Sequence, residues 1–155
     1  MTVLQPGDRA PDFSLPGDSG DTLSLRDFKG RKLVLYFYPK ADTPGCTKEA
    51  IAFNALKSAF ARAGADIVGV SADPVKAIGK FRDKHGLKLA LGSDEEKKML
   101  TAYGAWGEKS MYGRKFMGVR RVTYLIGPQG RIAQVWDNVK VDGHAEEVLT
   151  AARSL

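Results

Sequence analysis

The sequence predicts an α/β fold, with a central mixed sheet flanked by helices, in a single domain over residues 1–155. Two continuous apolar runs, RKLVLYFY at 31–38 and ADIVGVS at 65–71, have the length and composition of strands buried on both faces. A helical pattern lies between them, and a second strand–helix–strand succession follows. Such units indicate a parallel or mixed sheet, because the connecting helices cover its faces.

Runs of β-branched, aromatic and leucine residues between turn signals predict the strands. In chain order, these strands lie near Phe13 and at Leu23–Leu25, Arg31–Tyr38, Ala65–Ser71, Leu87–Leu91, Arg121–Ile126 and Arg131–Trp136. Pro, Gly and Asp in residues 5–30 predict turns around the first two, and Gly127–Pro128–Gln129–Gly130 predicts the turn between the last two. The terminal hairpin and helix then fit a thioredoxin-like layout.

Apolar residues at helical spacing and N-cap signals predict the helices. The first begins near Thr43 and is closed by Gly64, and the second begins after Asp73–Pro74 and reaches about His85. A third opens with the acids of residues 94–96, which suit the positive end of a helix, and ends near Tyr103. The last begins at Asp142. Residues 104–119 are expected to form a glycine-rich loop.

Composition excludes several classes of protein. Apolar residues make up 43% of the chain and charged residues 27%, a balance that a disordered chain lacks. No apolar run reaches the roughly 18 residues that cross a membrane, and residues 1–10 do not resemble a secretory signal, so a cytoplasmic protein without a membrane partner is expected. The net charge is +6, but the basic residues are scattered and no nucleic-acid-binding motif accompanies them, so no nucleic-acid partner is expected.

The single cysteine, Cys46, is the strongest candidate for chemistry. One cysteine forms no intramolecular disulfide, and with only two histidines a zinc site is not expected. Cys46 lies just inside the predicted helix start, where unpaired backbone N–H groups and the helix dipole stabilise negative charge and lower a thiol pKa. It shares a helix face with Phe53 and so should point toward the core, where burial opposes ionisation. A nucleophile there needs a fixed positive charge nearby; otherwise Cys46 is a buried small hydrophobe.

Around Cys46 the chain resembles a known family. The pattern Pro39-x-x-x-Thr43-x-x-Cys46 resembles the active-site signature of peroxiredoxins, and YFYPKADTPGCTKEA is similar to the peroxiredoxin Q, or bacterioferritin-comigratory protein, subfamily. The likeness spans essentially the whole chain. It extends to GDRAPDFSLPGDSGDTLSLRDFKG, YGAWGEKSMYGRK and VRRVTYLIGPQGRI. The resemblance implies a thioredoxin-like fold and an antioxidant, thiol-dependent peroxidase that acts on hydrogen peroxide and organic hydroperoxides, without a cofactor and as a monomer.

The resemblance also implies roles for individual residues. Cys46 is expected to be the peroxidatic thiolate, Thr43 to offer its hydroxyl to the peroxide, and Pro39 to shield the pocket from bulk water. Arg121 is expected to be the fixed charge beside the sulfur. The peroxide is thus expected to bind against these four residues and Gly45.

Several residues have a second interpretation. Thr43 also fits a simple N-cap before Pro44, and Pro39 also fits the end of a strand. Strand alternation places Arg120 and Arg121 on opposite faces without choosing between them; only the resemblance selects Arg121. Glu49 is expected to be a partner for an arginine or a surface acid.

Four further residues carry weaker expectations. Trp106 and Tyr112, in the expected glycine-rich loop, are candidates to cover the pocket. His85 and His144 lie near a helix end and a helix start without acid or cysteine clusters, and both are expected on the surface.

One position departs from the subfamily pattern. Many members read CTKEAC, with a second cysteine five residues after the first, whereas this chain has Ile51 there. The sequence therefore predicts a one-cysteine peroxidase whose sulfenic acid is reduced by an external thiol, either thioredoxin or glutathione with a glutaredoxin. The alternative is a peroxide-responsive redox sensor or regulatory binding protein, in which oxidation of Cys46 changes a partner contact.

Overall fold

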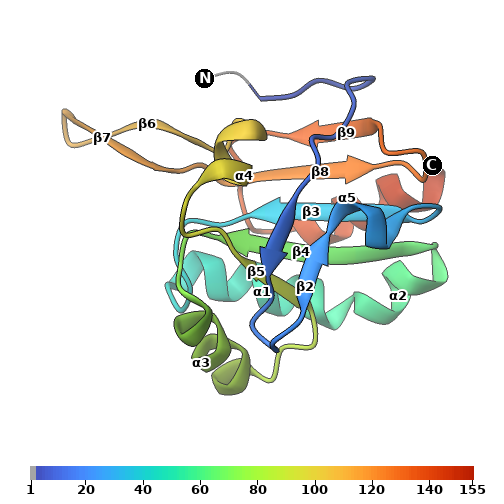
Figure 1. The fold of residues 1–155 in the computed structure, drawn as a ribbon, viewed down its shortest axis with the longest axis horizontal. Helices are drawn as coiled ribbons and strands as arrows, with labels where there is room; N and C mark the ends of the chain where they lie inside the picture. The colour runs from blue at the N-terminus through green and yellow to red at the C-terminus, as the bar shows by residue number, and fades with distance from the viewer. Residues whose placement is uncertain (1–2) are drawn as a thin grey trace.

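A five-stranded mixed sheet forms the centre of the fold (Figure 1). In this computed structural model, which describes residues 3–155, the strand order is β5-β4-β3-β8-β9. Strands β3, β4 and β5 run parallel, β8 runs antiparallel to β3, and β9 runs antiparallel to β8. Their bounds are β3 Lys32–Phe37, β4 Ala65–Ser71, β5 Ala90–Ser93, β8 Val122–Ile126 and β9 Ile132–Trp136. The predicted α/β class with a mixed sheet is confirmed.

The two faces of the sheet are covered differently. Four helices pack on one face: α1 Pro44–Ala55, α2 Lys57–Arg62, α3 Val75–His85 and α5 His144–Ser154. The other face is covered by a small sheet, a 3₁₀ turn and a short helix: β1 Ser14–Pro16, β2 Thr22–Ser24, η1 Leu25–Phe28 and α4 Lys98–Ala102. Figure 1 shows β1 and β2 crossing in front of the central sheet. No helix within residues 3–155 is long and apolar enough to cross a membrane.

Strand β3 contributes to both cores, as its unbroken apolar sequence predicts. Val34, Tyr36 and Tyr38, the last just beyond the strand, face the four helices. The alternate residues Leu33, Leu35 and Phe37 face the small sheet and α4. Because side chains alternate along a strand, a run without polar residues is compatible only with burial on both sides.

Three element boundaries differ from the prediction. The predicted helix 43–64 is interrupted at Leu56, whose N–H bonds to the carbonyl of Phe53 in a tighter turn between α1 and α2. The strand expected at 87–91 lies at Ala90–Ser93, where residues pair with β4 in parallel register. The helix expected at 94–103 is restricted to Lys98–Ala102, because Asp94 accepts the Leu100 N–H and the acids form a turn ahead of the helix.

The prediction of a glycine-rich loop at 104–119 was wrong. This segment forms an antiparallel hairpin of β6 Trp106–Met111 and β7 Arg114–Val119, which projects from the body of the molecule (Figure 1). Tyr112 and Gly113 connect the strands, and both have positive φ, 53° and 77°. Two central residues of positive φ suit a two-residue hairpin turn whose twist matches the flanking strands.

Candidate active site

Cys46 lies in the first turn of α1 and is 1% exposed. Thr43 occupies the N-cap position, Pro44 the first helical position, and the first helical hydrogen bond runs from the Thr47 N–H to the Thr43 carbonyl at 2.8 Å. The N–H groups of Gly45 and Cys46 therefore precede the helical hydrogen-bond ladder. The predicted position of the sulfur at a helix N-terminus and on the core-facing side is confirmed.

Arg121 reaches the sulfur from the turn between β7 and β8. Its Nη2 lies 3.4 Å from Cys46 Sγ, and its Nη1 donates a 2.6 Å hydrogen bond to Oε1 of Glu49. Gly45 leaves room for this approach, since a Cβ there would lie 3.1 Å from Arg121 Nη2. Burial lowers the pKa of Arg121, but Glu49 and Cys46 more than offset this and raise it overall. The guanidinium is thus a permanent positive charge beside the sulfur.

Arg120 points elsewhere, which decides between the two arginines. Its Nη2 contacts both carboxylate oxygens of Asp137, at 2.9 and 2.8 Å. Arg121 lies on the side of the chain shared with Thr123 and Leu125, and Leu125 belongs to the core cluster that contains Cys46. Alternation along β8 therefore directs Arg121 toward α1 and Arg120 away from it.

Glu49 is buried one helical turn after Cys46. It is 1% exposed, and burial raises its pKa to about 7, against the lowering effect of Arg121. Its second oxygen, Oε2, has no hydrogen-bond partner among the described residues. Glu49 is therefore a partner of Arg121, one of the two roles expected from the sequence, and is not a surface acid.

Two buried tyrosines that the sequence analysis did not select lie in the same cluster. The hydroxyls of Tyr36 and Tyr38 also have no partner among the described residues. Burial, the leading cause, raises the pKa of Tyr36 well above 10, and Glu49 and Cys46 add to the effect. Its ring stacks on Phe53 at 4.7 Å. Strand alternation could have placed both tyrosines beside the site, since residues 34, 36 and 38 share the face of β3 that packs on α1.

The loop between β3 and α1 is tied to other elements. Ala41 N–H donates to Asp73 at 2.7 Å, and Asp42 accepts from Lys84 at 2.9 Å. Thr43 does not cap the helix with its side chain; its hydroxyl donates instead to the Lys40 carbonyl at 2.7 Å. The Thr43 oxygen therefore keeps acceptor capacity on the side away from that bond. Pro39 is partly buried and lies two residues after the end of β3, just before this loop.

The structure does not bring the aromatic residues of the hairpin to Cys46. Trp106 packs against the opposite core cluster, with the Lys97 ammonium 5.2 Å from its ring centre. Tyr112 is at the hairpin tip and is 97% exposed. Neither covers the sulfur, because the segment is a projecting hairpin rather than a loop folded over the site.

The expectation that His144 lies on the surface was wrong. His144 begins α5, is 5% exposed, and its Nε2 lies 2.8 Å from Thr123 Oγ1. It contacts Phe53 edge-on. Burial, and secondarily the charge of Arg121, lowers its pKa to about 4, so it is neutral at pH 7. His85 is only partly exposed, and its Nε2 lies 3.0 Å from Asp42.

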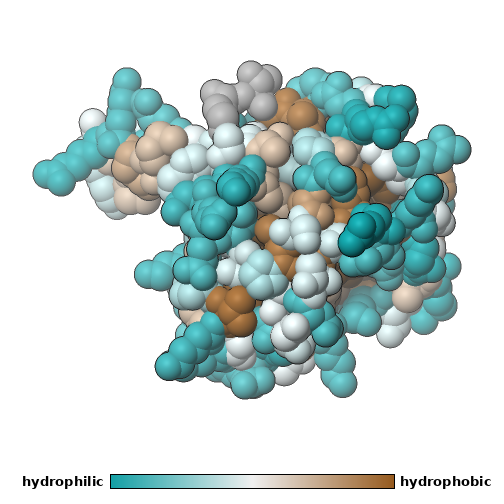
Figure 2. Space-filling view, in the orientation of Figure 1, coloured by the Kyte–Doolittle hydropathy of each residue, from teal (hydrophilic) through white to brown (hydrophobic). Residues whose placement is uncertain are grey.

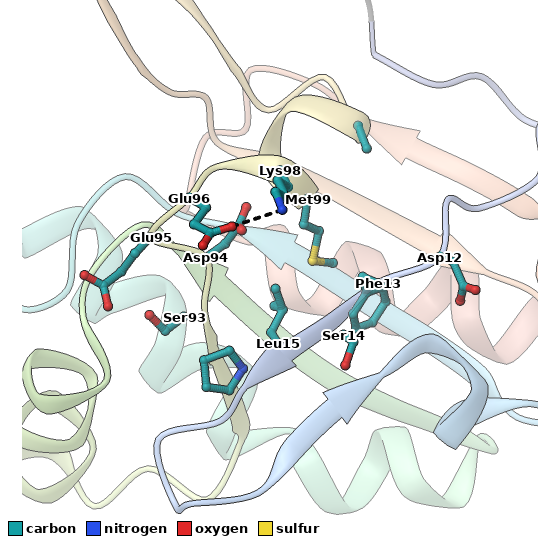
Figure 3. Close-up of a pocket in the computed structure, with 12 residues that line it drawn as sticks. Asp12, Phe13, Ser14, Leu15, Ser93, Asp94, Glu95, Glu96, Lys98 and Met99 are labelled. Atoms are coloured by element: carbon teal, nitrogen blue, oxygen red, sulfur yellow. Dashed lines mark ion pairs between the residues drawn. The ribbon is translucent and has the colours of Figure 1, made fainter.

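A cavity of about 530 Å³ lies on the other face of the sheet, away from this cluster. Figure 3 shows Asp94, Glu95 and Glu96 grouped on one side of it, with Phe13 and Leu15 toward its middle and Asp12 beyond Phe13. Asp94 already caps α4, and Glu96 pairs with Lys98. Within residues 3–155, no group of three or more His, Cys, Asp or Glu side chains is placed to hold a metal ion.

The cluster around Cys46 combines the parts of a thiol nucleophile. A sulfur at a helix N-terminus is adjacent to a guanidinium, which a buried carboxylate holds in place. Such a field stabilises negative charge that develops on an attacked group. The arrangement suits displacement at a small, weakly bonded electrophile.

Comparisons with known proteins agree with this chemistry. Residues 6–135 match the AhpC/TSA family. A Bacillus subtilis protein named peroxiredoxin Bcp is 43% identical over 153 residues, covering 99% of this chain and 98% of that protein. The Escherichia coli peroxiredoxin Bcp is 40% identical over 149 residues, 96% of each chain.

Solved structures give the same result. A Xylella fastidiosa PrxQ structure superimposes with a TM-score of 0.93 at 37% identity, covering 99% of this chain and 98% of that one. The Xanthomonas campestris bacterioferritin comigratory protein, in a structure concerned with its alkyl peroxide reduction activity, gives 0.89 at 40% identity, covering 99% and 97%.

Proposed function

The chain belongs to the AhpC/TSA family and is a thiol-dependent peroxidase of the peroxiredoxin Q type, and from this premise we propose that Cys46 is its peroxidatic residue. The observation that carries the proposal is the 3.4 Å contact between Arg121 Nη2 and Cys46 Sγ at the N-terminus of α1. Since this is the only cysteine in the sequence, no second thiol is available for the same task.

In the proposed reaction, the Cys46 thiolate attacks the terminal oxygen of a hydroperoxide. A sulfur–oxygen bond forms as the oxygen–oxygen bond breaks, and the departing alkoxide or hydroxide takes a proton and leaves as alcohol or water. Cys46 becomes a sulfenic acid, oxidised by two electrons. Arg121 and the N–H groups of Gly45 and Cys46 stabilise the charge on the reacting oxygens.

Three further residues have proposed roles in substrate binding and positioning. Thr43 uses the free acceptor capacity of its hydroxyl to take a hydrogen bond from the peroxide, and Pro39 shields the pocket from water. Glu49 fixes the Arg121 guanidinium through the 2.6 Å bond to Nη1. Gly45 leaves space for both the guanidinium and the peroxide. Alkyl peroxide reduction by the Xanthomonas campestris relative supports organic hydroperoxides as substrates alongside hydrogen peroxide.

Reduction of the sulfenic acid is proposed to require an external thiol, because the chain has no second cysteine. Thioredoxin, or glutathione with a glutaredoxin, would supply the two electrons, and the thiol itself serves as the redox group without a cofactor. We propose that the whole chain acts as one domain, as a monomer, and in the cytoplasm. There a reducing environment supplies such thiols.

Stopped-flow oxidation of the purified protein tests the proposal. Hydrogen peroxide and an organic hydroperoxide should each oxidise one thiol per chain, and dimedone should then add to Cys46 as judged by peptide mass. Cys46→Ser should keep the fold by circular dichroism and lose peroxide consumption. Turnover that survives in Cys46→Ser contradicts the assignment. Rapid oxidation without steady-state turnover by any thiol would favour the sensor hypothesis instead.

A further inference from the structure

The β6–β7 hairpin presents two chemically different faces. Residues directly opposite one another in an antiparallel pair place their side chains on the same face. The observed register therefore divides the hairpin into a first face of Gly107, Lys109, Met111, Arg114, Phe116 and Gly118 and a second face of Trp106, Glu108, Ser110, Lys115, Met117 and Val119. The proximity of Lys109 and Phe116 to the Cβ position of Gly118 confirms the assignment of the first face.

The first face, called here the basic–apolar face, carries two cations and no acid. Lys109 and Arg114 supply the charge, and Met111 and Phe116 are 57% and 42% exposed. On the second face, Glu108 lies 3.5 Å from Lys115, so the charges there compensate one another. Figure 2 shows pale brown, moderately hydrophobic residues next to teal, hydrophilic ones on this projection. Exposed apolar surface rimmed by charge is typical of a protein-binding site.

The tip of the hairpin adds an independent observation. Tyr112 is 97% exposed and has a φ of 53°, in the left-handed region that aromatic residues rarely adopt. Asn, Asp or Gly would occupy this turn position without strain. An exposed ring that makes no packing contribution and strains the backbone is not explained by folding, and such outliers concentrate at functional sites.

Trp106 and Val119, on the second face, pack into the core cluster on the other side of the sheet from Cys46, so the basic–apolar face lies on the active-site side of the hairpin. Arg121, which contacts Cys46 Sγ, follows the end of β7 by two residues. Lys109 donates a 3.0 Å hydrogen bond to the Val119 carbonyl at the hairpin base. Burial lowers the pKa of Lys109, Arg121 lowers it further, and Cys46 acts in the opposite direction, so Lys109 lies within the electrostatic reach of both.

We propose that the basic–apolar face and Tyr112 form the docking surface for the protein that reduces oxidised Cys46, a dithiol protein with an acidic, partly apolar surface around its reactive cysteine. This inference rests on the proposed function, because it presupposes an external reductant. It narrows the reductant to a protein, since a free small thiol has no use for an extended recognition surface.

Charge favours this occupant over a second copy of the chain. The protein carries a net charge of +6, so two copies repel one another, and a positive face would meet a positive molecule. An acidic partner is instead attracted to Lys109 and Arg114. Strand β7 ends two residues before Arg121, which contacts Cys46 Sγ, so a partner bound to the hairpin would lie beside the active site.

The redox step on this surface balances with two thiols from the partner. One partner thiol attacks the sulfenic sulfur of Cys46, so that a disulfide forms and water leaves. The second partner thiol then attacks its own first sulfur and displaces the Cys46 thiolate. The partner loses two electrons and becomes a disulfide, while Cys46 returns to its starting state.

Matched charge reversals on the two faces test the proposal. Reduced thioredoxin, recycled by its reductase and NADPH, serves as the dithiol protein, and dithiothreitol serves as a small reductant. Arg114→Glu on the basic–apolar face should raise the KM for thioredoxin about tenfold and reduce its salt dependence. Lys115→Glu changes the adjacent residue, on the other face, and should change the KM for thioredoxin by less than about twofold. Phe116→Ser on the basic–apolar face and Met117→Ser on the second face form a matched apolar pair. Phe116→Ser should raise the KM for thioredoxin much more than Met117→Ser does.

Single-turnover oxidation of Cys46 by peroxide and turnover with dithiothreitol should be unchanged in all four variants, which shows that the fold and the chemistry are intact. The proposal is overturned if substitutions on the two faces raise the KM for thioredoxin equally, or if turnover with dithiothreitol falls as much as turnover with thioredoxin. The proposal is also overturned if sedimentation shows that the unmodified protein is a dimer and that Phe116→Ser is a monomer, since the face would then be an interface between two copies of the chain. Absence of peroxide oxidation in the unmodified protein would instead refute the proposed function.

Discussion

Arg120 and Arg121 are adjacent in the sequence, but only Arg121 contacts the candidate active site. Arg121 joins the Cys46 sulfur to the buried carboxylate of Glu49, whereas Arg120 pairs with Asp137 at the surface. The sequence identified Arg121 only through family resemblance, because alternation treats the two residues alike. The structure adds the missing constraint, since one face of β8 packs on α1 and the other does not.

Replacing Arg121 with Ala should reduce the rate constant for oxidation of Cys46 by hydrogen peroxide about 100-fold, the usual cost of losing one electrostatic donor at a reacting oxygen. Stopped-flow fluorescence measures this rate. Arg120→Ala should leave it within about twofold. Arg121→Ala also leaves the buried carboxylate of Glu49 without its partner, which destabilises the fold. The double variant Arg121→Ala with Glu49→Gln removes that charge, and its oxidation rate constant should be reduced as much as in Arg121→Ala. A double variant with restored rate would contradict the role.

Two buried titratable groups have opposite effects on stability. The pKa of His144 falls to about 4 through burial, so the folded protein binds fewer protons than the unfolded chain between about pH 4 and 6.5, and stability is lost as pH falls through that window. The pKa of Glu49 rises to about 7 through burial, so its contribution is lost as pH rises from about 4.5 to 7.

His144→Gln should isolate the first effect. Glutamine retains a group able to bond Thr123 and does not titrate, so the stability advantage of the native protein over the variant should shrink by about 2 kcal/mol between pH 7 and pH 4. Urea unfolding at a series of pH values measures it. A constant difference across that range would show that the His144 pKa is not displaced. No pattern in the sequence predicts this burial, which depends on how α5 packs over Phe53 and Thr123.

At the scale of elements, helix α1 positions the chemistry through its first turn. Gly45 supports the site through a missing side chain, because any Cβ there would lie 3.1 Å from Arg121 Nη2. The start of this helix was predicted accurately from Thr43 and Pro44, which are local signals. Its interruption at Leu56 was not, because no proline or glycine marks it.

Gly45→Ala should therefore slow peroxide oxidation about tenfold by displacing the guanidinium, while the fold remains intact because alanine is the better helix former. Gly79→Ala in α3, where a Cβ meets open space, is the matched control. It should raise the free energy of unfolding by up to about 1 kcal/mol and leave the rate unchanged. Equal rates in the two variants would show that Gly45 has no special steric role.

The hairpin shows where sequence patterns are insufficient. Strands buried on both faces, such as β3 and β4, are visible as apolar runs, and both were predicted to within two residues. Strands β6 and β7 are mostly exposed and contain Gly, Ser and charged residues, so neither alternation nor an apolar run identifies them. The pairing of the two strands and a turn with positive φ at Tyr112 define this element instead.

Over the whole molecule, the two ends of β3 have different surroundings. The strand leads toward Cys46 at its carboxyl end. At its other end, Lys32 Nζ donates to the carbonyls of Ala63, after α2, and Ala152, in the last turn of α5, at 3.0 and 2.8 Å. One ammonium thus serves the negative ends of two helices.

Lys32→Met should lower the free energy of unfolding by about 2 kcal/mol, since it removes both charge-assisted bonds. Peroxide oxidation of Cys46 should be unaffected, because the substitution is at the far end of the sheet. Lys76→Met, at an exposed position in α3, should change stability by less than about 0.5 kcal/mol. Thermal unfolding and stopped-flow rates together check both points. A slower reaction in Lys32→Met would show that the two ends are coupled.

Ile51 faces outward on α1 and is 46% exposed, at the position where the subfamily pattern that the sequence resembles has a second cysteine. The sequence has no second cysteine, so the proposed Cys46 sulfenic acid has no thiol of its own chain to react with, and in the proposed cycle its lifetime depends on how fast an external thiol reduces it. If peroxide arrives faster, a second equivalent converts it to sulfinic acid, which ordinary thiols do not reverse. In the proposed cycle, the supply of external thiol thus sets the peroxide dose above which each molecule is permanently inactivated.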